Sequence, residues 1–359
     1  MKKRLNGSHS CDQLQKIELF STRWMDFVRS HVDATCFHHP AWAGLLADCY
    51  GHQSFAVTLT NENGEITAGL PVIEIKRPWN GRRWVSLPFT DHCTPLAIDD
   101  EALQNLVLNL IEAKRTYNLS SIQVRADLKM NVAGGDSFNS QSDAFLHTLR
   151  LQADAQSLFR QFKKTQVRQV ILKAEREGVD VHWGDSLCDL EVFYNLHVGT
   201  RRRLGIPIQP KRFFDLLWER ILSTGLGFLL IAYKKDDRPI AGAVFLVWNG
   251  VIIYKYGASD PKFLRLRPNN LLLWYAIHWG CDNNYHTFDF GRTDAENMGL
   301  RKFKIGWGTE EVSLVYSAVG DRPTKFSLGQ MSKVLSGVIR CLPPWVCRAT
   351  GELFYKYTA

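Results

Sequence analysis

Several features that define common protein classes are missing from this sequence of 359 residues. It has no apolar run near the roughly 18 residues that a membrane-spanning helix requires. The basic start Met1-Lys2-Lys3-Arg4 is not followed by the apolar stretch of a secretory signal. No GxxxxGK[ST] loop is present, so a P-loop nucleotidase is unsupported. These absences predict a cytoplasmic protein.

Cysteines are scattered rather than clustered. The 8 cysteines include no pair in CxxC spacing, which argues against a structural zinc site or a thioredoxin motif. Disulfide frameworks are typical of short secreted chains, not of one this long. We therefore expect reduced thiols, no metal ion and no permanently bound cofactor.

What is present is the composition of an ordinary globular protein, with 45% hydrophobic and 22% charged residues. The length suits two domains of about 150 residues each. Aromatic residues reach 12%, which favours large buried cores over a groove lined with rings. The net charge of +8 favours a polyanionic partner: nucleic acid, a nucleotide phosphate or an anionic membrane surface.

An internal duplication organises the chain. A predicted strand begins at Phe55 and another at Phe228, and each is followed by a polar turn and a second strand. The second strands contain Ala68-Gly69 and Ala241-Gly242. The separations 228 minus 55 and 241 minus 68 both equal 173 residues, so the two hairpins align without a gap.

Each half continues with a strand-helix-strand unit. Strands are predicted at 83–87, 121–125, 251–256, 287–290 and 312–316, and helices at 41–50, 101–117, 212–222 and 269–282. Hairpins that lead into such units give a mixed sheet with helices on both faces, which is an α/β (α+β) fold. We expect two domains, 1–150 and 151–320, and a basic amphipathic tail at 321–359.

Two further segments carry specific expectations. The polar stretch 134–142 predicts a loop, the most mobile part of the chain. Residues 158–178 predict one basic helix, whose cations are either a solvated face or a contact for phosphates.

Motifs in the second half carry a family resemblance. A strand that ends in Asp289-Phe-Gly-Arg292 is followed by Phe303-Lys-Ile-Gly-Trp-Gly308 and by Leu314-Val-Tyr316. This arrangement resembles the Fem-like transferases of the GNAT acyltransferase superfamily, over 155–318 well and over 35–130 more faintly. Three more segments are similar to that group: Lys173 to Gly178, Arg201 to Pro207 and Pro268-Asn-Asn270.

The resemblance implies a tandem of two GNAT-like domains, each a mixed sheet flanked by helices. It also implies transfer of an acyl or aminoacyl group to an amine, as in the family's peptidoglycan-bridge enzymes and its exopolysaccharide and exosortase relatives. The co-substrate would be an acyl-CoA or an aminoacyl-tRNA, and the basic segment 158–178 favours tRNA. The acceptor would be a small-molecule or lipid-linked sugar, a precursor of the cell envelope or of exopolysaccharide.

The sequence departs from acetyl-CoA-dependent GNAT enzymes at one loop. Their loop resembles Gln/Arg-x-x-Gly-x-Gly/Ala, whose glycines let backbone N–H groups approach a pyrophosphate at a helix N-terminus. The matching stretch contains Arg265, Arg267, Asn269 and Asn270, our candidates for binding the donor phosphate, but Pro268 removes an N–H donor. This change keeps open an alternative from another class, a catalytically inert RNA- or polysaccharide-binding module.

Acyl transfer to an amine requires a proton acceptor and donors aimed at the developing oxyanion. We assign Lys304 and Arg292 to donor phosphate binding or to oxyanion stabilisation; by resemblance, Lys304 matches the family's functional lysine. Asp289 alternates with Phe288 and Phe290, so it points away from the face that those rings bury. It would orient Arg292, act as the base, or fix the loop through an ion pair.

Arginines supply one group of candidate substrate-binding residues. Arg201, Arg202 and Arg203 form a dense cationic run, which suits a phosphate or carboxylate of the acceptor or is a solvated helix end. Thr90 and Asp91 follow a predicted strand and suit polar contacts to the acceptor.

Rings supply the other candidates. Phe303 and Trp307 offer faces for stacking on adenine or a sugar, although core packing is the more frequent role. His92 and Cys93, which follow Asp91, do not form a convincing nucleophilic triad, because adjacent residues on a strand point to opposite sides.

The tail at 321–359 is basic, with 6 Lys or Arg residues against 2 acidic ones. Apolar pairs such as Val334-Leu335 and Trp345-Val346 alternate with these cations, and Pro343-Pro344 interrupts any helix. The tail therefore either lies on an anionic membrane surface, which would make the protein peripheral on the inner membrane face, or packs on the protein's own core.

Overall fold

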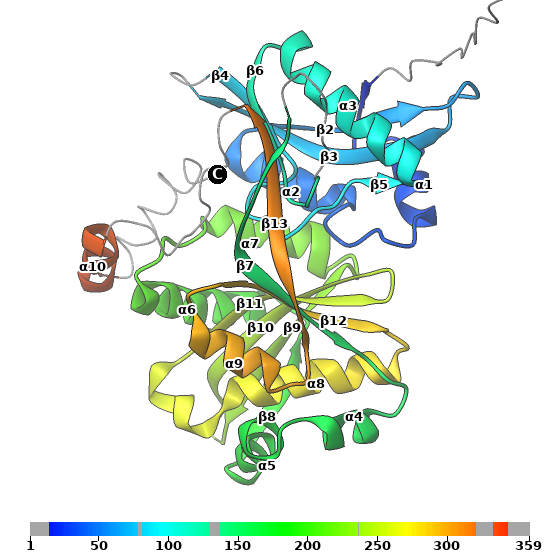
Figure 1. Ribbon diagram of the computed structural model, residues 1–359. Helices are drawn as coiled ribbons and strands as arrows, with labels where there is room; N and C mark the ends of the chain where they lie inside the picture. The colour runs from blue at the N-terminus through cyan, green and yellow to red at the C-terminus, as the bar shows by residue number, and fades with distance from the viewer. Residues whose placement is uncertain (1–13, 78–80, 129–136, 236, 321–332, 344–359) are drawn as a thin grey trace, which may run out of the picture.

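One mixed sheet of 13 strands, with helices on both faces, forms the frame of the described part of the chain (Figure 1). The computed structural model describes residues 14–77, 81–128, 137–235, 237–320 and 333–343. The predicted α/β (α+β) class is confirmed by this arrangement.

The sheet consists of two groups of six strands in matching spatial order. The first group contains β1 (Gln15–Ile17), β2 (Gln53–Thr60), β3 (Ile66–Arg77), β4 (Gly81–Val85), β6 (Leu119–Val124) and β13 (Glu310–Gly320). The second, counted from its outer edge, contains β8 (Val179–Gly184), β9 (Gly227–Lys234), β10 (Arg238–Trp248), β11 (Val251–Ser259), β12 (Thr287–Asp294) and β7 (Asn139–Arg150). The short strand β5 (Leu96–Ala97) pairs with β3.

The two predicted hairpins have the same register. Phe55 in β2 lies opposite Val72 in β3, and Phe228 in β9 lies opposite Phe245 in β10. The next four pairs of each hairpin keep the same offset of 173 residues. The duplication inferred from the sequence is therefore present in the backbone.

A glycine in each hairpin admits an aromatic ring from a helix. A Cβ on Gly69 would lie 2.7 Å from the Trp24 ring of α1 (Thr22–Ser30), and one on Gly242 would lie 2.9 Å from the Phe193 ring of α6 (Leu187–Leu204). These distances are too short for a real Cβ, so glycine lets helix and sheet pack closely at equivalent places.

The helices sort into the same plan. In the first half α2 (Pro40–Tyr50) and α3 (Asp100–Thr116) accompany α1. In the second half α6 is accompanied by α7 (Lys211–Leu217), the π-helical turn η2 (Trp218–Leu222), the 3₁₀ turn η3 (Pro261–Leu266), α8 (Pro268–Asp282) and α9 (Met298–Ile305).

Alternate residues of β10 pack into different hydrophobic cores. Val244 and Leu246 join a core shared with the first half, whereas Ala243 and Phe245 join the core that includes α8.

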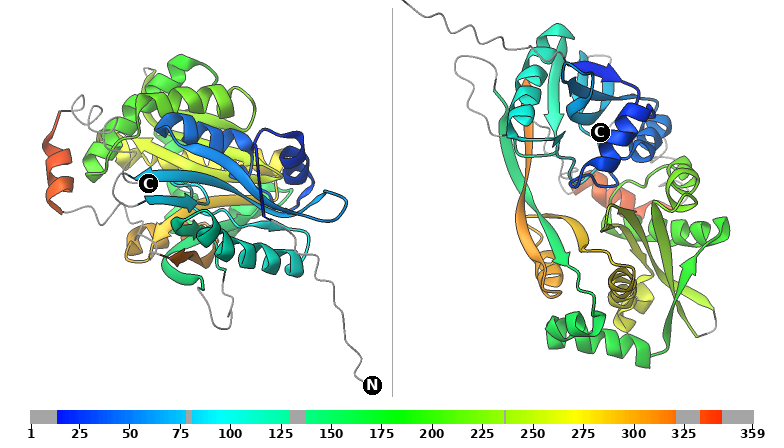
Figure 2. Two further views of the ribbon diagram at one scale, coloured as in Figure 1. Left: turned by 90° about the horizontal axis from the view of Figure 1, so that it is seen from above. Right: turned by 90° about the vertical axis from the view of Figure 1, so that its right-hand side faces the viewer.

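The last strand of each half completes the sheet of the other. β7 follows β6 in the chain but pairs with β12, and β13 follows β12 but pairs with β6. The two exchanged strands also pair with each other from Glu310↔Thr148 to Ala318↔Asn139, and they connect the two halves along one side of the molecule (Figures 1 and 2). The boundaries proposed at 150 and 320 thus cut the chain between halves that share strands.

Two predictions about the region between the halves need correction. Residues 139–142 were expected in a loop, but they begin β7, because β13 offers their backbone a partner; residues 134–136 lie outside the described chain. The single helix expected at 158–178 is three pieces: α4 (Ala155–Gln161), the π-helical turn η1 (Lys164–Arg168) and α5 (Gln169–Arg176). The break lies at Phe162, whose extended backbone places its ring against Trp274 and Trp307.

Part of the tail packs on the protein. Helix α10 (Lys333–Cys341) contacts α6, and Ile339 is buried in the shared core. Arg340 donates a hydrogen bond to the Leu204 carbonyl. A membrane role for the residues beyond 343 stays a prediction, because they lie outside the described chain. No helix among the described residues combines the length and apolar composition needed to cross a bilayer.

Ser317 of β13 joins the two exchanged strands to the segment that follows β6. Its buried hydroxyl donates to the Ala126 carbonyl at 2.8 Å, accepts from the Leu128 N–H at 2.8 Å, and bonds the Ser140 hydroxyl at 3.0 Å. We predict that Ser317→Ala lowers the free energy of unfolding by about 1–3 kcal/mol, because buried groups lose their partner. Urea denaturation measures this change in the free energy of unfolding.

The matched control is Ser313→Ala on the same strand, where the hydroxyl is exposed and bonds Ser142. It should change stability by no more than about 0.5 kcal/mol. Equal losses in the two variants would contradict the role given to Ser317.

Candidate active site

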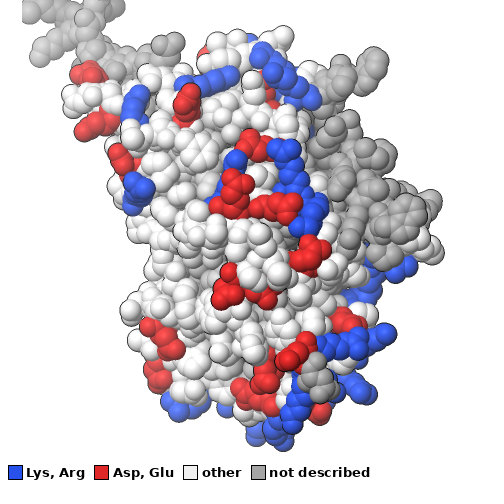
Figure 3. Space-filling view, turned by 180° about the vertical axis from the view of Figure 1, so that it is seen from behind, with Lys and Arg blue, Asp and Glu red and all other residues white. Residues whose placement is uncertain are grey.

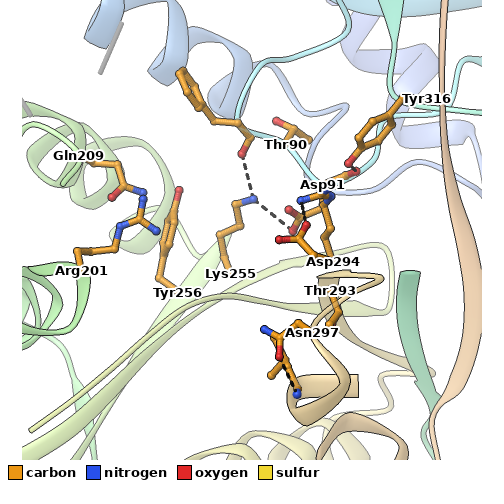
Figure 4. Close-up of a pocket in the computed structure, with 13 residues that line it drawn as sticks. Thr90, Asp91, Arg201, Gln209, Lys255, Tyr256, Thr293, Asp294, Asn297 and Tyr316 are labelled. Atoms are coloured by element: carbon orange, nitrogen blue, oxygen red, sulfur yellow. Dashed lines mark hydrogen bonds and ion pairs between the residues drawn. The ribbon is translucent and has the colours of Figure 1, made fainter. Parts of the chain in front are cut away.

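A pocket lies where the strands β11 and β12 separate. They pair in parallel only from Val251↔Thr287 to Ile253↔Asp289, although β11 continues to Ser259 and β12 to Asp294. Their diverging ends, together with a loop of the first half, enclose a cavity of about 250 Å³ (Figure 4). Its lining comprises Phe89, Thr90, Asp91, Arg201, Gln209, Lys255, Tyr256, Arg292, Thr293, Asp294, Asn297, Leu300 and Tyr316.

The loop after β4 delivers first-half residues to this pocket. Leu87 and Phe89 both have φ of 59°, a left-handed conformation that costs bulky residues about 1–2 kcal/mol each. The Thr90 hydroxyl accepts a hydrogen bond from the Trp42 indole N–H at 2.9 Å. The Asp91 carbonyl accepts one from the Tyr316 hydroxyl at 2.8 Å. These contacts hold the strained loop between α2 and β13.

Lys255 of β11 binds this loop directly. Its ammonium donates to the Phe89 carbonyl at 3.2 Å and lies 3.4 Å from the Asp91 carboxylate (Figure 4). It also lies over the rings of Phe37 and Trp42, at 5.2 and 5.4 Å from their centroids. Burial opposes the ionised form of Asp91, but Lys255 and then His92 outweigh it, so the pKa of Asp91 is lowered. Asp91 is therefore an anion at neutral pH.

The Phe-Gly-Arg motif forms an irregular end of β12. The pairing of β12 with β7 shifts register between Asp289 and Arg292, and Gly291 has φ of 71°. A Cβ on Gly291 would lie 3.2 Å from the Asp91 carboxylate. Both the backbone conformation and the close approach of Asp91 therefore favour glycine here.

Asp289 is buried and binds the first half. Its carboxylate accepts one hydrogen bond from the His92 Nε2–H at 2.9 Å and another from the Gly291 N–H at 2.6 Å. Burial opposes a charge on His92, but the hydrogen bond and charge of Asp289 outweigh it and raise the pKa of His92. Of the expected roles, the structure shows the ion pair; Asp289 does not orient Arg292.

Lys304 lies beneath the pocket wall, with 3% of its surface exposed. Its ammonium donates to the Gly291 carbonyl at 2.7 Å and to the Arg292 carbonyl at 3.2 Å. Burial lowers the pKa of Lys304 to about 8, while the charges of Asp91 and Asp289 oppose this shift. Lys304 is thus a cation held at the irregular end of β12.

Arg292 lines the pocket, but carboxylates already engage it. Its guanidinium lies 3.0 Å from Asp143 and 2.6 Å from Asp294. A guanidinium between two carboxylates is poorly disposed to bind a phosphate of the donor. Its position favours a role in shaping the acidic end of the pocket.

The three consecutive arginines 201–203 differ in their relation to the pocket. Arg201 lines the pocket and donates to the Pro207 carbonyl through Nε, and its buried Nη2 has no hydrogen-bond partner. Arg203 donates to the Ser259 carbonyl at 3.4 Å, and neither Arg202 nor Arg203 is in the lining. Of the three, only Arg201 offers a donor to a ligand in this pocket.

The remaining candidates lie elsewhere. Trp307 is fully buried and packs on Phe162 and Phe290, so it is unsuited to stacking on a substrate; Phe303 packs beside it, outside the pocket lining. The four candidates for the donor phosphate precede or begin α8, also outside the lining: Arg265, Arg267, Asn269 and Asn270. The Asn270 N–H is already bonded to the Arg267 carbonyl, and Asn270 is buried. With Pro268 lacking an N–H, this helix start has few donors for a phosphate.

Several pocket residues escaped the sequence analysis. Lys255 and Tyr256 lie in the strand predicted at 251–256, and Gln209 lies in a segment for which no role was predicted. The Gln209 side chain bonds the His197 imidazole, 2.9 Å away. The partners of Lys255 are Phe89 and Asp91, more than 160 residues away in the chain, which no local spacing reveals. Tyr316 lies in a quoted motif, and His92 directly follows Asp91, so these two carried the signal that was available.

The pocket has two chemically different ends (Figure 4). Asp91 and Asp294 provide carboxylates near Arg292 and Asn297, whereas Arg201 and Gln209 lie across the cavity beyond Lys255. An amine suits the first end and an anionic or amide group suits the second. Within the described residues, no three His, Cys, Asp or Glu side chains gather to bind a metal ion.

Comparison with known proteins shows which chains this one resembles in sequence and fold. Residues 160–304 match the family model of the acetyltransferase (GNAT) domain. The crystal structure of FemX superimposes with a TM-score of 0.68 at 15% identity, covering 85% of this chain and 96% of that one. The structure of L-PGS from Bacillus licheniformis gives 0.56 at 14% identity, covering 91% and 99%. The fold is therefore that of GNAT proteins.

Among proteins of known activity, this chain is similar to two aminoacyltransferases. The UDP-N-acetylmuramoylpentapeptide-lysine N(6)-alanyltransferase of Weissella viridescens is 24% identical over 167 residues, which are 45% of this chain and 44% of the relative. The lipid II:glycine glycyltransferase of Staphylococcus aureus is 32% identical over 76 residues, 20% and 18% of the two chains. The aligned segment thus spans less than half of each relative. Together, these findings support a Fem-like member of the GNAT superfamily, as the motifs predicted.

Gly291 provides a test of the site's geometry. We predict that Gly291→Ala lowers the free energy of unfolding by about 1–2 kcal/mol, because alanine disfavours the left-handed backbone, and that it displaces Asp91. Chemical denaturation measures the first effect and a crystal structure the second. The control Gly299→Ala, in α9 with no close neighbour, should leave stability unchanged or slightly raised. A Gly291→Ala protein of unaltered stability would refute this reading.

Proposed function

We propose that this protein is an N-acyltransferase that moves an acyl or aminoacyl group from an activated donor to an amine of a cell-envelope or exopolysaccharide precursor. The observation that carries the proposal is the pocket between β11 and β12, with carboxylates at one end and Arg201 at the other. The similarity to the alanyl- and glycyltransferases supports the same class of reaction.

The acidic end would receive the acceptor. An amine arrives mostly as an ammonium at neutral pH, and the anionic Asp91, in the lining and 23% exposed, pairs with such a group. Asp91 also lies where it can accept the proton that the nitrogen loses, because Asp289 is buried outside the lining. Arg201 would bind a phosphate or carboxylate of the same acceptor.

The reaction then has a simple balance. The ammonium first loses one proton to solvent, which gives the amine its lone pair. The nitrogen then bonds to the acyl carbon, and its second proton passes through Asp91 to the donor's oxygen or sulfur as the bond from that atom to the acyl carbon breaks. The carbonyl oxygen becomes negative in the transition state. Lys304 is buried outside the lining, where it donates to the Gly291 and Arg292 carbonyls, so its positive charge would act on the oxyanion from behind the pocket wall.

The donor is better supported as an aminoacyl ester than as an acyl-CoA. Pro268 and the bonded N–H of Asn270 reduce the donors at the start of α8, where a pyrophosphate would bind. The relatives' names specify alanyl and glycyl transfer. An aminoacyl-tRNA would also suit the exposed cations of α4, η1 and α5, which include Arg160, Lys164 and Lys173. On the face opposite to Figure 1, basic side chains lie among acidic ones (Figure 3).

The test of the function uses the purified full chain with three ligand sets: acyl-CoAs, aminoacyl-tRNAs and nucleotide-sugars. We expect binding of an aminoacyl-tRNA and amide formation on an amine-bearing nucleotide-sugar or lipid-linked precursor, followed by mass spectrometry. Binding of acyl-CoA alone would reject the tRNA donor. Absence of binding to all three would favour an inert binding module instead.

Lys304→Met should lower kcat about 100-fold or more, because it removes the positive charge behind the pocket wall while keeping a side chain of similar size. In the unmodified enzyme, kcat should fall as the pH rises through about 8, where Lys304 loses its proton. Circular dichroism checks that the variant is folded. Lys302→Met, an exposed change on the same helix, should retain activity; comparable kcat in both variants would remove Lys304 from the mechanism.

A further inference from the structure

We propose that His92 is a positioning residue: from the first half of the molecule it fixes, through Asp289, the Gly291 peptide that holds the ammonium of Lys304. This inference rests on the proposed function. It assigns a role to a residue that lies outside the pocket lining and does not touch the substrate.

A continuous series of hydrogen bonds connects the two residues. His92 donates from Nε2 to one oxygen of Asp289 at 2.9 Å, and the other oxygen accepts from the Gly291 N–H at 2.6 Å. The carbonyl of Gly291 then accepts from Lys304 at 2.7 Å. Each step ends on a different atom of the next group, so the position of the imidazole is transmitted to the carbonyl that Lys304 binds.

The imidazole is itself held by the first half. Its ring meets Phe37 edge-on, with centroids 5.4 Å apart and planes at 83°. The loop that carries it includes the two left-handed residues Leu87 and Phe89. A loop in that conformation persists only where its surroundings hold it. The position of His92 therefore depends on how the first half packs on the second.

The charges of His92 and Asp289 add an electrostatic link to Lys304 beside the hydrogen bonds. Asp289 is 2% exposed, and a buried carboxylate that loses its charged partner becomes costly. The other charged or titratable groups near His92 are Asp91, Lys255 and His38. Those near Lys304 are Asp91, Asp289 and His147. His92 therefore partly neutralises one of the two carboxylates that favour the ammonium form of Lys304.

Two substitutions should shift the pKa of Lys304 in opposite directions. Asp289→Asn removes a negative charge beside Lys304 and should lower its pKa below about 8. His92→Gln keeps a donor but removes a positive charge, which leaves Asp289 uncompensated and should raise the same pKa. A merely structural role for His92 predicts no opposite shifts. His286→Gln, an exposed histidine of the second half, is the control and should leave Lys304 unchanged.

The measurement is the pH titration of the Lys304 side-chain carbon signal in 13C-lysine-labelled full-length protein, assigned with Lys304→Met. The opposite shifts would support the proposal; no shift in either variant would overturn it. If the variants do not fold, a measurement on the unmodified protein still tests the proposal. The 1H–15N spectrum of its His92 should show a proton on Nε2, the atom that donates to Asp289, and a ring whose Nε2 carries no proton would overturn it.

Activity is scored separately. In an active enzyme, His92→Gln should lower kcat about tenfold with little change in KM, and the alkaline limb of its pH profile should move up with the Lys304 titration. Unaltered kcat and pH profile in this variant would count against positioning. Inactivity of the unmodified enzyme with every donor would reject the proposed function, whatever the spectra show.

Discussion

The pairing of β7 with β13 is the contact on which the rest of the molecule depends. Each strand belongs in sequence to one half and completes the sheet of the other, so the halves are joined by backbone hydrogen bonds as well as by side chains. This fixes the loop after β4 over the diverging ends of β11 and β12. Asp91 consequently meets Lys255, and His92 meets Asp289, across sequence separations of 164 and 197 residues.

The site concentrates charge in a place where little water reaches. Lys255, Asp289 and Lys304 are nearly inaccessible, and each has an oppositely charged group or carbonyls within hydrogen-bonding distance. Buried charges are tolerated only with such partners, and removal of one partner is generally more damaging than removal of the pair. The Phe-Gly-Arg motif is explained by this requirement, because Gly291 lets Asp91 and the carbonyls for Lys304 occupy the same small volume.

Much of the fold followed from local pattern. The hairpins were predictable because Phe55 and Phe228, and the glycines Gly69 and Gly242, repeat at one offset, and the register confirms it. β7 was not predictable, since its polar first residues become a strand only through their pairing with β13. The break of the basic helix at Phe162 likewise depends on Trp274 and Trp307, which lie more than a hundred residues away.

The site was predictable to a similar degree. Motifs and position brought forward Thr90, Asp91, Arg201 and Arg292, all of which line one pocket, but they also suggested a ring-stacking role for the buried Trp307. Lys255 carried no signal, because its importance arises from the loop that folds over it. Residues whose role is set by backbone geometry nearby can be found in a sequence, whereas those set by a distant partner require the structure.

The exchange of strands also has a consequence for synthesis of the chain. When a ribosome has finished the first half, β6 has one neighbour, β4, and its other edge has no strand beside it, because β13 is encoded almost two hundred residues later. Exposed strand edges attract other chains. The nascent N-terminal half must therefore keep an open edge, or have it shielded, until the ribosome has nearly reached the end of the message.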